Sequence, residues 1–144
     1  MNYSANFSPR VSDSEIFESI KKEKQDIGYY NLPFQDTTLI KEYAKTVKQK
    51  DIAIIGIGGS TLGTFAIYSF LTRTHNFDKK LYFFESTDPI DINTRLERLD
   101  LENTLFIVIS KSGTTIETIS VFKYLYSKVK IDKNNCLIIT ETDS

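Results

Sequence analysis

The fold is decided by residues 51–63, which read DIAIIGIGGSTLG. A short run of mostly β-branched residues, Ile52–Ile55, is followed by four glycines within Gly56–Gly63 and then by a helical pattern. The run is apolar throughout, which is typical of a parallel strand with both faces covered. Glycine adopts backbone dihedrals that other residues avoid, and it leaves no Cβ between the main chain and a ligand. The stretch therefore predicts a strand, a sharp turn open to a ligand, and a helix.

The alternation of strand and helix continues through the rest of the chain. Three further apolar runs are predicted as strands, at Leu81–Glu85, Leu105–Ile109 and Leu137–Thr140. Helical patterns separate the four runs, at Thr61–Leu71, Ile90–Leu99 and Thr115–Val129. Alternation at this spacing implies right-handed crossovers between parallel strands. We therefore predict an α/β fold with an open, doubly wound, mainly parallel sheet of the Rossmann-like kind.

Two helices are predicted ahead of the first strand. Ser12 and Glu15 have the spacing of a capping box and precede apolar residues at helical intervals. Asp36 is expected to cap the second helix, and Pro33 separates the two because proline disfavours helix in the residue before it. The predicted organisation is a helical segment at residues 1–50, with no chemistry of its own, followed by a ligand-binding domain at residues 51–144.

The composition restricts the class of protein. The chain has 144 residues, a formal net charge of −1 and one cysteine, Cys136. This balance of charge gives no reason to expect nucleic acid or an anionic membrane surface as a partner. No apolar run approaches the roughly 20 residues that a membrane-spanning helix needs, and the N-terminus shows no signal peptide. We expect a cytoplasmic protein in which Cys136 is a buried, unreactive thiol.

The turn after the third predicted strand is rich in hydrogen-bond donors. Ser110–Thr115 contains four hydroxyl groups, one glycine and the ammonium group of Lys111. A phosphate dianion needs many donors at short range, and rotating hydroxyls and the free N–H groups of a helix start supply them. A capped turn needs only one of the hydroxyls. Because Lys111 is the only formal cation, the loop fits a sugar monophosphate better than a polyphosphate with magnesium, which would also require a carboxylate ligand.

The glycine-rich turn Gly56–Gly63 is expected at the same edge, since ligands bind outside the carboxyl ends of the strands in such sheets. Ser60 or Thr61 is expected to cap the helix that follows. A dinucleotide fingerprint would need glycine or alanine at Thr61, although Glu85 could serve as its ribose-binding acid. A Walker A loop would need Gly-Lys-Ser/Thr at its end, which is absent. We interpret Ser110–Thr115 as the phosphate cradle and this turn as the sugar side of the site.

Three other positions are candidates for lesser roles. Asp88-Pro89 predicts the start of a helix that Asp88 caps. Glu117, in the first turn of another helix, either complements the helix dipole or orients a second group at the site. His75 is the only histidine, and it lies in a polar stretch after a helix, where we expect it to be exposed and to take no part in acid–base chemistry.

Both loops resemble motifs of the glucose-6-phosphate isomerase family. Ile55–Gly63 matches the Ile-Gly-Ile-Gly-Gly-Ser-x-Leu-Gly stretch of that family, and Ser110–Thr118 matches Ser-Lys-Ser/Thr-x-Thr-Thr-x-Glu-Thr. The two motifs occur in the family's order and at compatible spacing, and the resemblance covers residues 51–144. It implies the N-terminal sugar-isomerase domain of an enzyme that interconverts glucose 6-phosphate and fructose 6-phosphate through a cis-enediol, without cofactor or metal.

The resemblance also implies roles for individual residues. Carried over by motif, Gly59 and Ser60 contact the sugar phosphate. The phosphate cradle consists of four residues, Ser110, Lys111, Ser112 and Thr115. Glu117 takes a supporting role near the catalytic centre. For the whole protein, the resemblance implies a homodimer.

The catalytic glutamate, arginine, histidine and lysine of the family match no position in this chain, which stops just past a predicted strand. We therefore expect the N-terminal part of an isomerase, which holds the substrate, contains no catalytic base and is inactive when isolated. Two alternatives stay open. One is a non-catalytic domain of a regulator that senses a sugar phosphate, and the other, less favoured, is a nicotinamide-binding domain.

Overall fold

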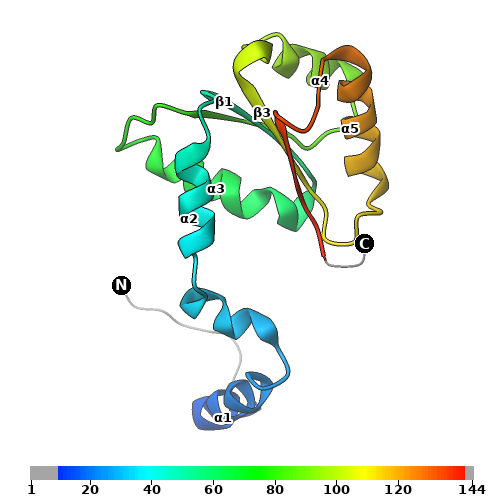
Figure 1. The fold of residues 1–144 in the computed structure, drawn as a ribbon. Helices are drawn as coiled ribbons and strands as arrows, with labels where there is room; N and C mark the ends of the chain where they lie inside the picture. Colours follow the sequence, from blue (N-terminus) through cyan, green and yellow to red (C-terminus); the bar gives the residue numbers. More distant parts are fainter. Residues whose placement is uncertain (1–9, 142–144) are drawn as a thin grey trace. The chain divides into compact units, whose positions relative to one another are not determined.

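The computed structural model describes residues 10–141, which divide into two compact units with the boundary between Ala44 and Lys45. The first unit contains helix α1 (Asp13–Glu23) and the 3-10 helix η1 (Gly28–Phe34), and helix α2 (Thr38–Thr46) crosses the boundary (Figure 1). The four strands and three further helices belong to the second unit. The two leading helices are therefore present, as predicted.

Both caps predicted for the leading helices are confirmed. Ser12 N donates to Glu15 Oε2 at 2.7 Å, and Glu15 N donates to Ser12 Oγ at 3.3 Å, so the capping box at α1 is complete. The hydrogen bonds from the Ser12 backbone and side chain hold the pKa of Glu15 below its usual value. At α2, Asp36 Oδ1 accepts a hydrogen bond of 2.9 Å from Thr38 N, the first N–H group of the helix.

A parallel sheet forms the centre of the second unit, which confirms the predicted fold class. Strands β1 (Asp51–Ile55), β2 (Lys80–Phe84), β3 (Thr104–Ile109) and β4 (Cys136–Ile139) lie in the order β2-β1-β3-β4, and every pair is parallel. Each strand begins and ends within one residue of the predicted bounds. In β1, one of the two inner strands, Asp51 aligns with Lys80 on one side and with Thr104 on the other.

The helices between the strands are α3 (Leu62–Leu71), α4 (Pro89–Leu96) and α5 (Ile116–Lys128), with short 3-10 turns η2 (Gly58–Ser60) and η3 (Leu101–Asn103). The prediction that the second of them extends to Leu99 is wrong. Arg98 N and Leu99 N donate to carbonyls three residues back, so the chain tightens into turns after Leu96. Leu99 still contributes to the core, which explains why the sequence pattern looks helical as far as this residue.

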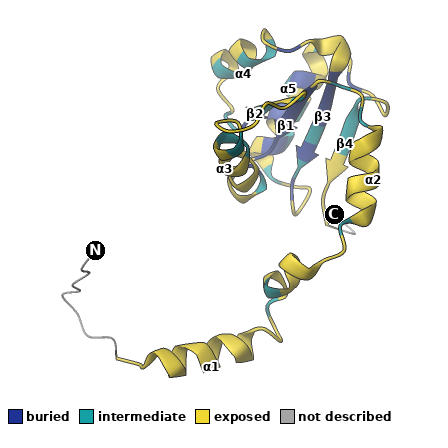
Figure 2. Ribbon diagram, turned by 90° about the vertical axis from the view of Figure 1, so that its left-hand side faces the viewer, coloured by how far each residue is buried: buried dark blue, intermediate teal, exposed yellow. Residues whose placement is uncertain are grey.

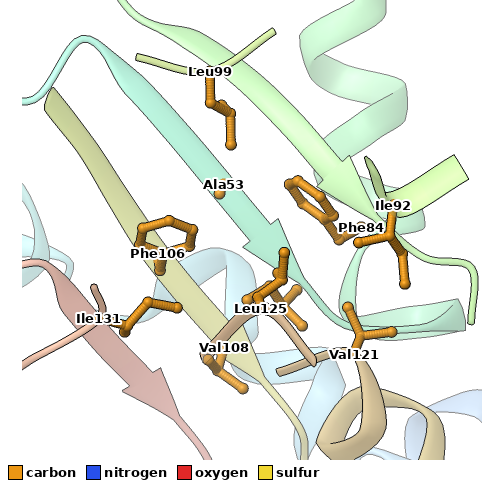
Figure 3. Packing of buried hydrophobic residues seen from close by; sticks show 10 residues of the cluster. Ala53, Phe84, Ile92, Leu99, Phe106, Val108, Val121, Leu125 and Ile131 are labelled. Atoms are coloured by element: carbon orange, nitrogen blue, oxygen red, sulfur yellow. The ribbon is translucent and has the colours of Figure 1, made fainter. Parts of the chain in front are cut away.

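The hydrophobic core has one layer on each face of the sheet. On one face, Ile92 of α4 and Val121 and Leu125 of α5 pack against Phe84 and Phe106 (Figure 3). On the other face, a smaller cluster of Ile52, Ile54, Phe83 and Leu105 packs against side chains that include Tyr68 of α3. The helices α3 and α5 therefore cover opposite faces of the sheet.

Burial is uneven across the sheet, and two predictions fail at its β4 side (Figure 2). Both faces of every strand were expected to be covered, yet Ile138 is 62% exposed and Ile139 is 48% exposed. Cys136, predicted to be buried, is half-buried, although burial still raises the pKa of its thiol. The physical reason is position, because β4 has a neighbouring strand on one side only among the described residues.

Candidate functional site

The order of the strands places the candidate site between the carboxyl ends of β1 and β3. The chain leaves β1 through α3 on one face of the sheet and leaves β3 through α5 on the other face. Adjacent strands whose connections diverge in this way form a topological switch point, which is the usual ligand crevice of doubly wound sheets. The glycine-rich turn after β1 and the hydroxyl-rich turn after β3 thus flank this crevice.

Gly56, the first residue of the glycine-rich turn, lies against the end of β3. A Cβ atom on Gly56 would lie 3.0 Å from the Ile109 carbonyl oxygen and 3.1 Å from Thr61 Cγ2. Gly56 N also donates to the Phe84 carbonyl oxygen at 3.4 Å, which joins the turn to the end of β2. Glycine at this position therefore lets the ends of β1 and β3 approach each other.

The first turn is stabilised by its own backbone. Ile57 O accepts from Ser60 N at 3.2 Å, Gly58 O accepts from Thr61 N at 3.1 Å, and Gly58 has a φ of 57°, which favours glycine. The expectation that Ser60 or Thr61 caps the next helix is wrong, because α3 has no side-chain cap in the described structure. Thr61 is fully buried, and its hydroxyl turns back to donate to Gly58 O at 3.3 Å. The first N–H groups of α3 are thus left without a side-chain acceptor.

The second turn brings two of the predicted phosphate ligands together. Ser110 is 7% exposed, and its hydroxyl donates to Thr115 Oγ1 at 3.1 Å. Thr115 occupies the N-cap position of α5, but no side-chain cap bond is present among the described residues, so the first-turn N–H groups stay available. The macrodipole of this 13-residue helix adds roughly half a positive charge at the same place.

Ser112 is engaged differently from Ser110 and Thr115. Ser112 Oγ accepts hydrogen bonds from Thr114 N at 3.3 Å and Thr114 Oγ1 at 2.9 Å. Gly113, with a φ of 66°, allows the turn between them. Ser112 and Thr114 are both exposed, so this pair forms the solvent side of the turn.

The segment after β4 belongs to the same edge, which the sequence did not indicate. Lys111 Nζ lies 3.4 Å from Glu141 Oε1, and Glu141 N donates to the Lys111 carbonyl oxygen at 3.0 Å. Thr140 Oγ1 donates to the same carbonyl at 3.3 Å. The only formal cation of the hydroxyl-rich turn is therefore partly neutralised by an exposed carboxylate.

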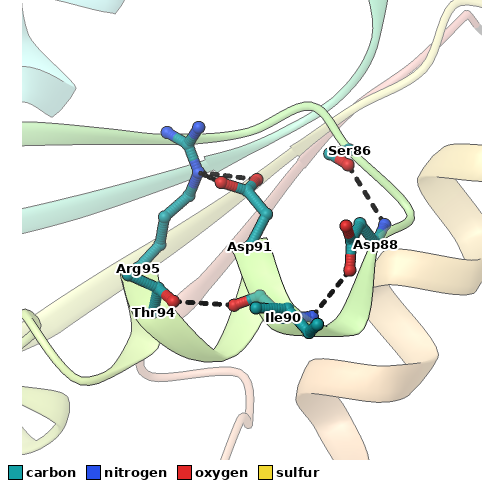
Figure 4. A network of polar contacts seen from close by, with 6 residues as sticks. All are labelled: Ser86, Asp88, Ile90, Asp91, Thr94 and Arg95. Carbon is teal, nitrogen blue, oxygen red and sulfur yellow. Dashed lines mark hydrogen bonds and ion pairs between the residues drawn. The ribbon is translucent and has the colours of Figure 1, made fainter.

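The remaining candidates take the places that their sequence patterns indicate. Glu117 is exposed in the first turn of α5, where it complements the helix dipole. Asp88 caps α4, because Asp88 Oδ1 accepts from Ile90 N at 2.8 Å, and Ser86 Oγ accepts from Asp88 N at 3.1 Å (Figure 4). His75 lies after the end of α3, away from the carboxyl ends of the strands. Its side chain is exposed, and a hydrogen bond of 2.8 Å joins its Nδ1 to Thr74 Oγ1.

These features place the chain in a class of protein, the doubly wound α/β proteins, in which the switch point is the usual place for a small ligand. Comparison with known proteins then places the chain more narrowly. It belongs to the phosphoglucose isomerase family, whose sequence profile matches residues 20–135. The resemblance predicted from the two motifs is therefore confirmed at the level of the family.

Individual relatives agree with this family. The glucose-6-phosphate isomerase of Campylobacter jejuni is 35% identical over 127 residues, which cover 83% of this chain and 31% of the relative. That of Borreliella burgdorferi is 38% identical over 106 residues, 67% of this chain and 20% of the relative. This chain thus spans less than a third of the length of either relative.

Solved structures show the same fold. The crystal structure of a glucose-6-phosphate isomerase from Chlamydia trachomatis superimposes with a TM-score of 0.66 at 25% identity, covering 96% of this chain and 26% of that one. A hypothetical protein from Thermus thermophilus gives a TM-score of 0.72 at 23% identity, covering 89% of this chain and 33% of that one, and supports the fold alone.

Two further features are absent from the described residues. No helix between residues 10 and 141 is long and apolar enough to cross a membrane. Within the same range, no cluster of three or more His, Cys, Asp or Glu side chains is placed to hold a metal ion.

Proposed function

We propose that this chain holds the substrate in an enzyme that interconverts glucose 6-phosphate and fructose 6-phosphate. The observation that carries the proposal is the close approach of Gly56 to Ile109 at the end of β3, which places the start of the glycine-rich turn beside the start of the hydroxyl-rich turn at the switch point. Membership of the phosphoglucose isomerase family supports the substrate class. The enzyme activity is proposed for the whole protein, because this chain spans less than a third of the length of its relatives.

In this proposal the phosphate group binds at the start of α5. In the structure, the hydroxyls of Ser110 and Thr115 are hydrogen-bonded to each other. In the proposed complex both hydroxyls turn to the phosphate oxygens instead, and the uncapped N–H groups of the helix donate to the same phosphate. Ser112 adds a further hydroxyl from the solvent side, and Lys111 supplies the formal positive charge. Charge-assisted hydrogen bonds of this kind are about twice as strong as neutral ones.

The sugar is proposed to lie toward the turn after β1. Gly59 is exposed with no heavy atom within 4 Å of a Cβ position, so a ligand can reach its backbone. Ser60 is half-buried beside it and offers a hydroxyl. Glu117 is proposed to orient a group at the catalytic centre from the first turn of α5.

Proton transfer through a cis-enediol requires a base between neighbouring sugar carbons. We propose that another part of the whole protein supplies this base and that the isolated chain binds substrate without converting it. His75, the only histidine, is placed away from the crevice and is not proposed to take part in the proton transfer.

The test is a thermal-unfolding titration of the full chain with 6-phosphogluconate, a sugar-phosphate mimic, and separately with NAD. We expect 6-phosphogluconate to raise the unfolding temperature and NAD to leave it unchanged. A ligand at 100 times its Kd stabilises a protein by about 2.7 kcal/mol, which is readily measured. Protection by NAD alone would show that the site binds a nicotinamide cofactor and not a sugar phosphate.

A double variant, Ser110→Ala with Thr115→Ala, locates the response. We expect it to weaken 6-phosphogluconate binding about tenfold, which corresponds to about 1.4 kcal/mol. The matched control is Thr72→Ala with Ser127→Ala, because these exposed hydroxyls only donate to carbonyls of their own helices. Equal losses in the two double variants would place the ligand elsewhere.

Glu141 provides a test of the role proposed for the Lys111 charge. We expect Glu141→Gln to tighten the binding of 6-phosphogluconate about twofold at low salt, because it frees the Lys111 ammonium group from its carboxylate partner. The gain should shrink at high salt, since both groups are exposed. Glu97→Gln, at the far end of α4, removes the same charge at a distance and serves as the control. Weaker binding in Glu141→Gln would contradict the role given to Lys111.

A further inference from the structure

Two buried side-chain oxygens lack a hydrogen-bond partner among the described residues, and both lie at the candidate site's edge of the sheet. They are Glu85 Oε1, directly after β2, and Thr118 Oγ1, in the first turn of α5. Most buried polar atoms in proteins are hydrogen-bonded, so each exception calls for a reason. Sequence rules are most often broken at functional sites.

Thr118 is the better placed of the two. It is 2% exposed and lies one helical turn after Thr115, on the same face of α5. Together with Ser110 and Gly113 it lines a cavity of about 230 Å³ between β3, β4 and the start of α5. The uncapped end of α5 and a buried hydroxyl without a partner therefore occur beside the same turn.

The Thr118 hydroxyl costs stability in the structure as it stands. A buried donor without a partner loses its hydrogen bonds to water and gains none in return. Valine has nearly the same shape, so it would fill the same space without this loss. The presence of threonine is explained if the hydroxyl finds a partner in another state of the protein.

We propose that Thr118 is a positioning residue whose hydroxyl becomes hydrogen-bonded when an anion binds at the start of α5. This inference rests on the proposed function. The anion draws the hydroxyls of Ser110 and Thr115 toward itself, which breaks the bond between them and rearranges the turn that borders the cavity. The Thr118 hydroxyl then forms a hydrogen bond with the rearranged turn, and this new hydrogen bond adds to the affinity for the ligand.

The proposal predicts opposite changes in stability and in binding. Thr118→Val should unfold at the same or a higher temperature than the wild-type chain, and it should bind 6-phosphogluconate about five- to tenfold more weakly. Thr118→Ser keeps the hydroxyl and should bind within about twofold of the wild type. A residue that only packs in the core would not lose binding while gaining stability, nor would serine restore it.

The experiment is isothermal titration of the full wild-type chain and both variants with 6-phosphogluconate, alongside thermal unfolding without ligand. Unchanged binding in Thr118→Val would overturn the role of Thr118 and leave the proposed function intact. Equal weakening in the valine and serine variants would also overturn it, since the methyl contacts rather than the hydroxyl would then matter. A wild-type chain that binds no 6-phosphogluconate would contradict the proposed function, on which this inference rests.

Discussion

Replacing Phe106 by alanine is expected to lower the free energy of unfolding of the second unit by about 3–5 kcal/mol. Phe106 has no exposed surface, lies in the middle of β3 and packs in the larger core cluster (Figure 3). The substitution removes the ring and leaves a cavity that the surrounding strands and α5 cannot fill by small shifts. Because a domain of this size is stable by about 5–15 kcal/mol in total, the loss is a large fraction of its stability.

Urea unfolding followed by circular dichroism measures this change, and Phe70→Ala is the matched control. Phe70 is the same residue type but is 71% exposed on α3, so its loss should change the stability by about 0.5 kcal/mol or less. If the two variants lost equal stability, the assignment of Phe106 to the larger core cluster would be wrong. The test uses the full chain, and the urea concentration at the midpoint of unfolding is read from the loss of the circular dichroism signal of the sheet.

Gly56→Ala is expected to destabilise the second unit by about 1–3 kcal/mol and to abolish the protection by 6-phosphogluconate. The added methyl group would meet the Ile109 carbonyl oxygen at 3.0 Å, and Ile109 is held in the sheet by its pairing with Ile139 of β4. The ends of β1 and β3 must then move apart, which separates the two turns that flank the crevice. The expected effect is therefore on binding as well as on stability.

Gly63→Ala is the control for the effect of this substitution on stability. Gly63 is near the start of α3, and a Cβ atom there would meet nothing within 4 Å. Alanine in a helix is favoured over glycine by up to about 1 kcal/mol, so this variant should be as stable as the wild type or more stable. Thermal unfolding with and without 6-phosphogluconate compares the two variants directly. Retained protection in Gly56→Ala would show that the site does not depend on the close approach of the strands.

Local signals in the sequence predicted the elements of this fold well. The apolar runs indicated all four strands, and the two inner strands, β1 and β3, need no alternation because they are largely buried on both faces. The caps at Ser12, Asp36 and Asp88 followed from residue types that accept hydrogen bonds from the first N–H groups of a helix. Such features depend on a few neighbouring residues, and the sequence contains all the information that they need.

Features that depend on distant residues could not be predicted in this way. The order of the strands, and with it the switch point, arises from pairing between segments far apart in the chain. The exposure of Ile138 follows from the lateral position of β4, which its composition does not reveal. The hydroxyl of Thr61 turns away from α3 because a 3-10 turn precedes the helix.

In the candidate site, too, the local features were predictable from the sequence and those that depend on distant residues were not. The residue types of Ser110–Thr115 indicated donors for a phosphate group, and their chemistry follows from the sequence alone. The carboxylate of Glu141 beside Lys111 and the unpartnered hydroxyl of Thr118 came to light only in the structure. Both depend on how β4 and α5 pack around the turn, which no local pattern encodes.

The central place of β1 has a consequence for how the protein folds. Asp51 pairs with Lys80 and with Thr104, and no two sequential strands of the described sheet form a hairpin. The chain must therefore lose the entropy of closing long loops before strand pairing stabilises it, and folds with such distant contacts form slowly. Gly56 meets Ile109 only after β3 has joined the sheet. Ligand binding should thus appear late in refolding, with the last strands and not with the first helices.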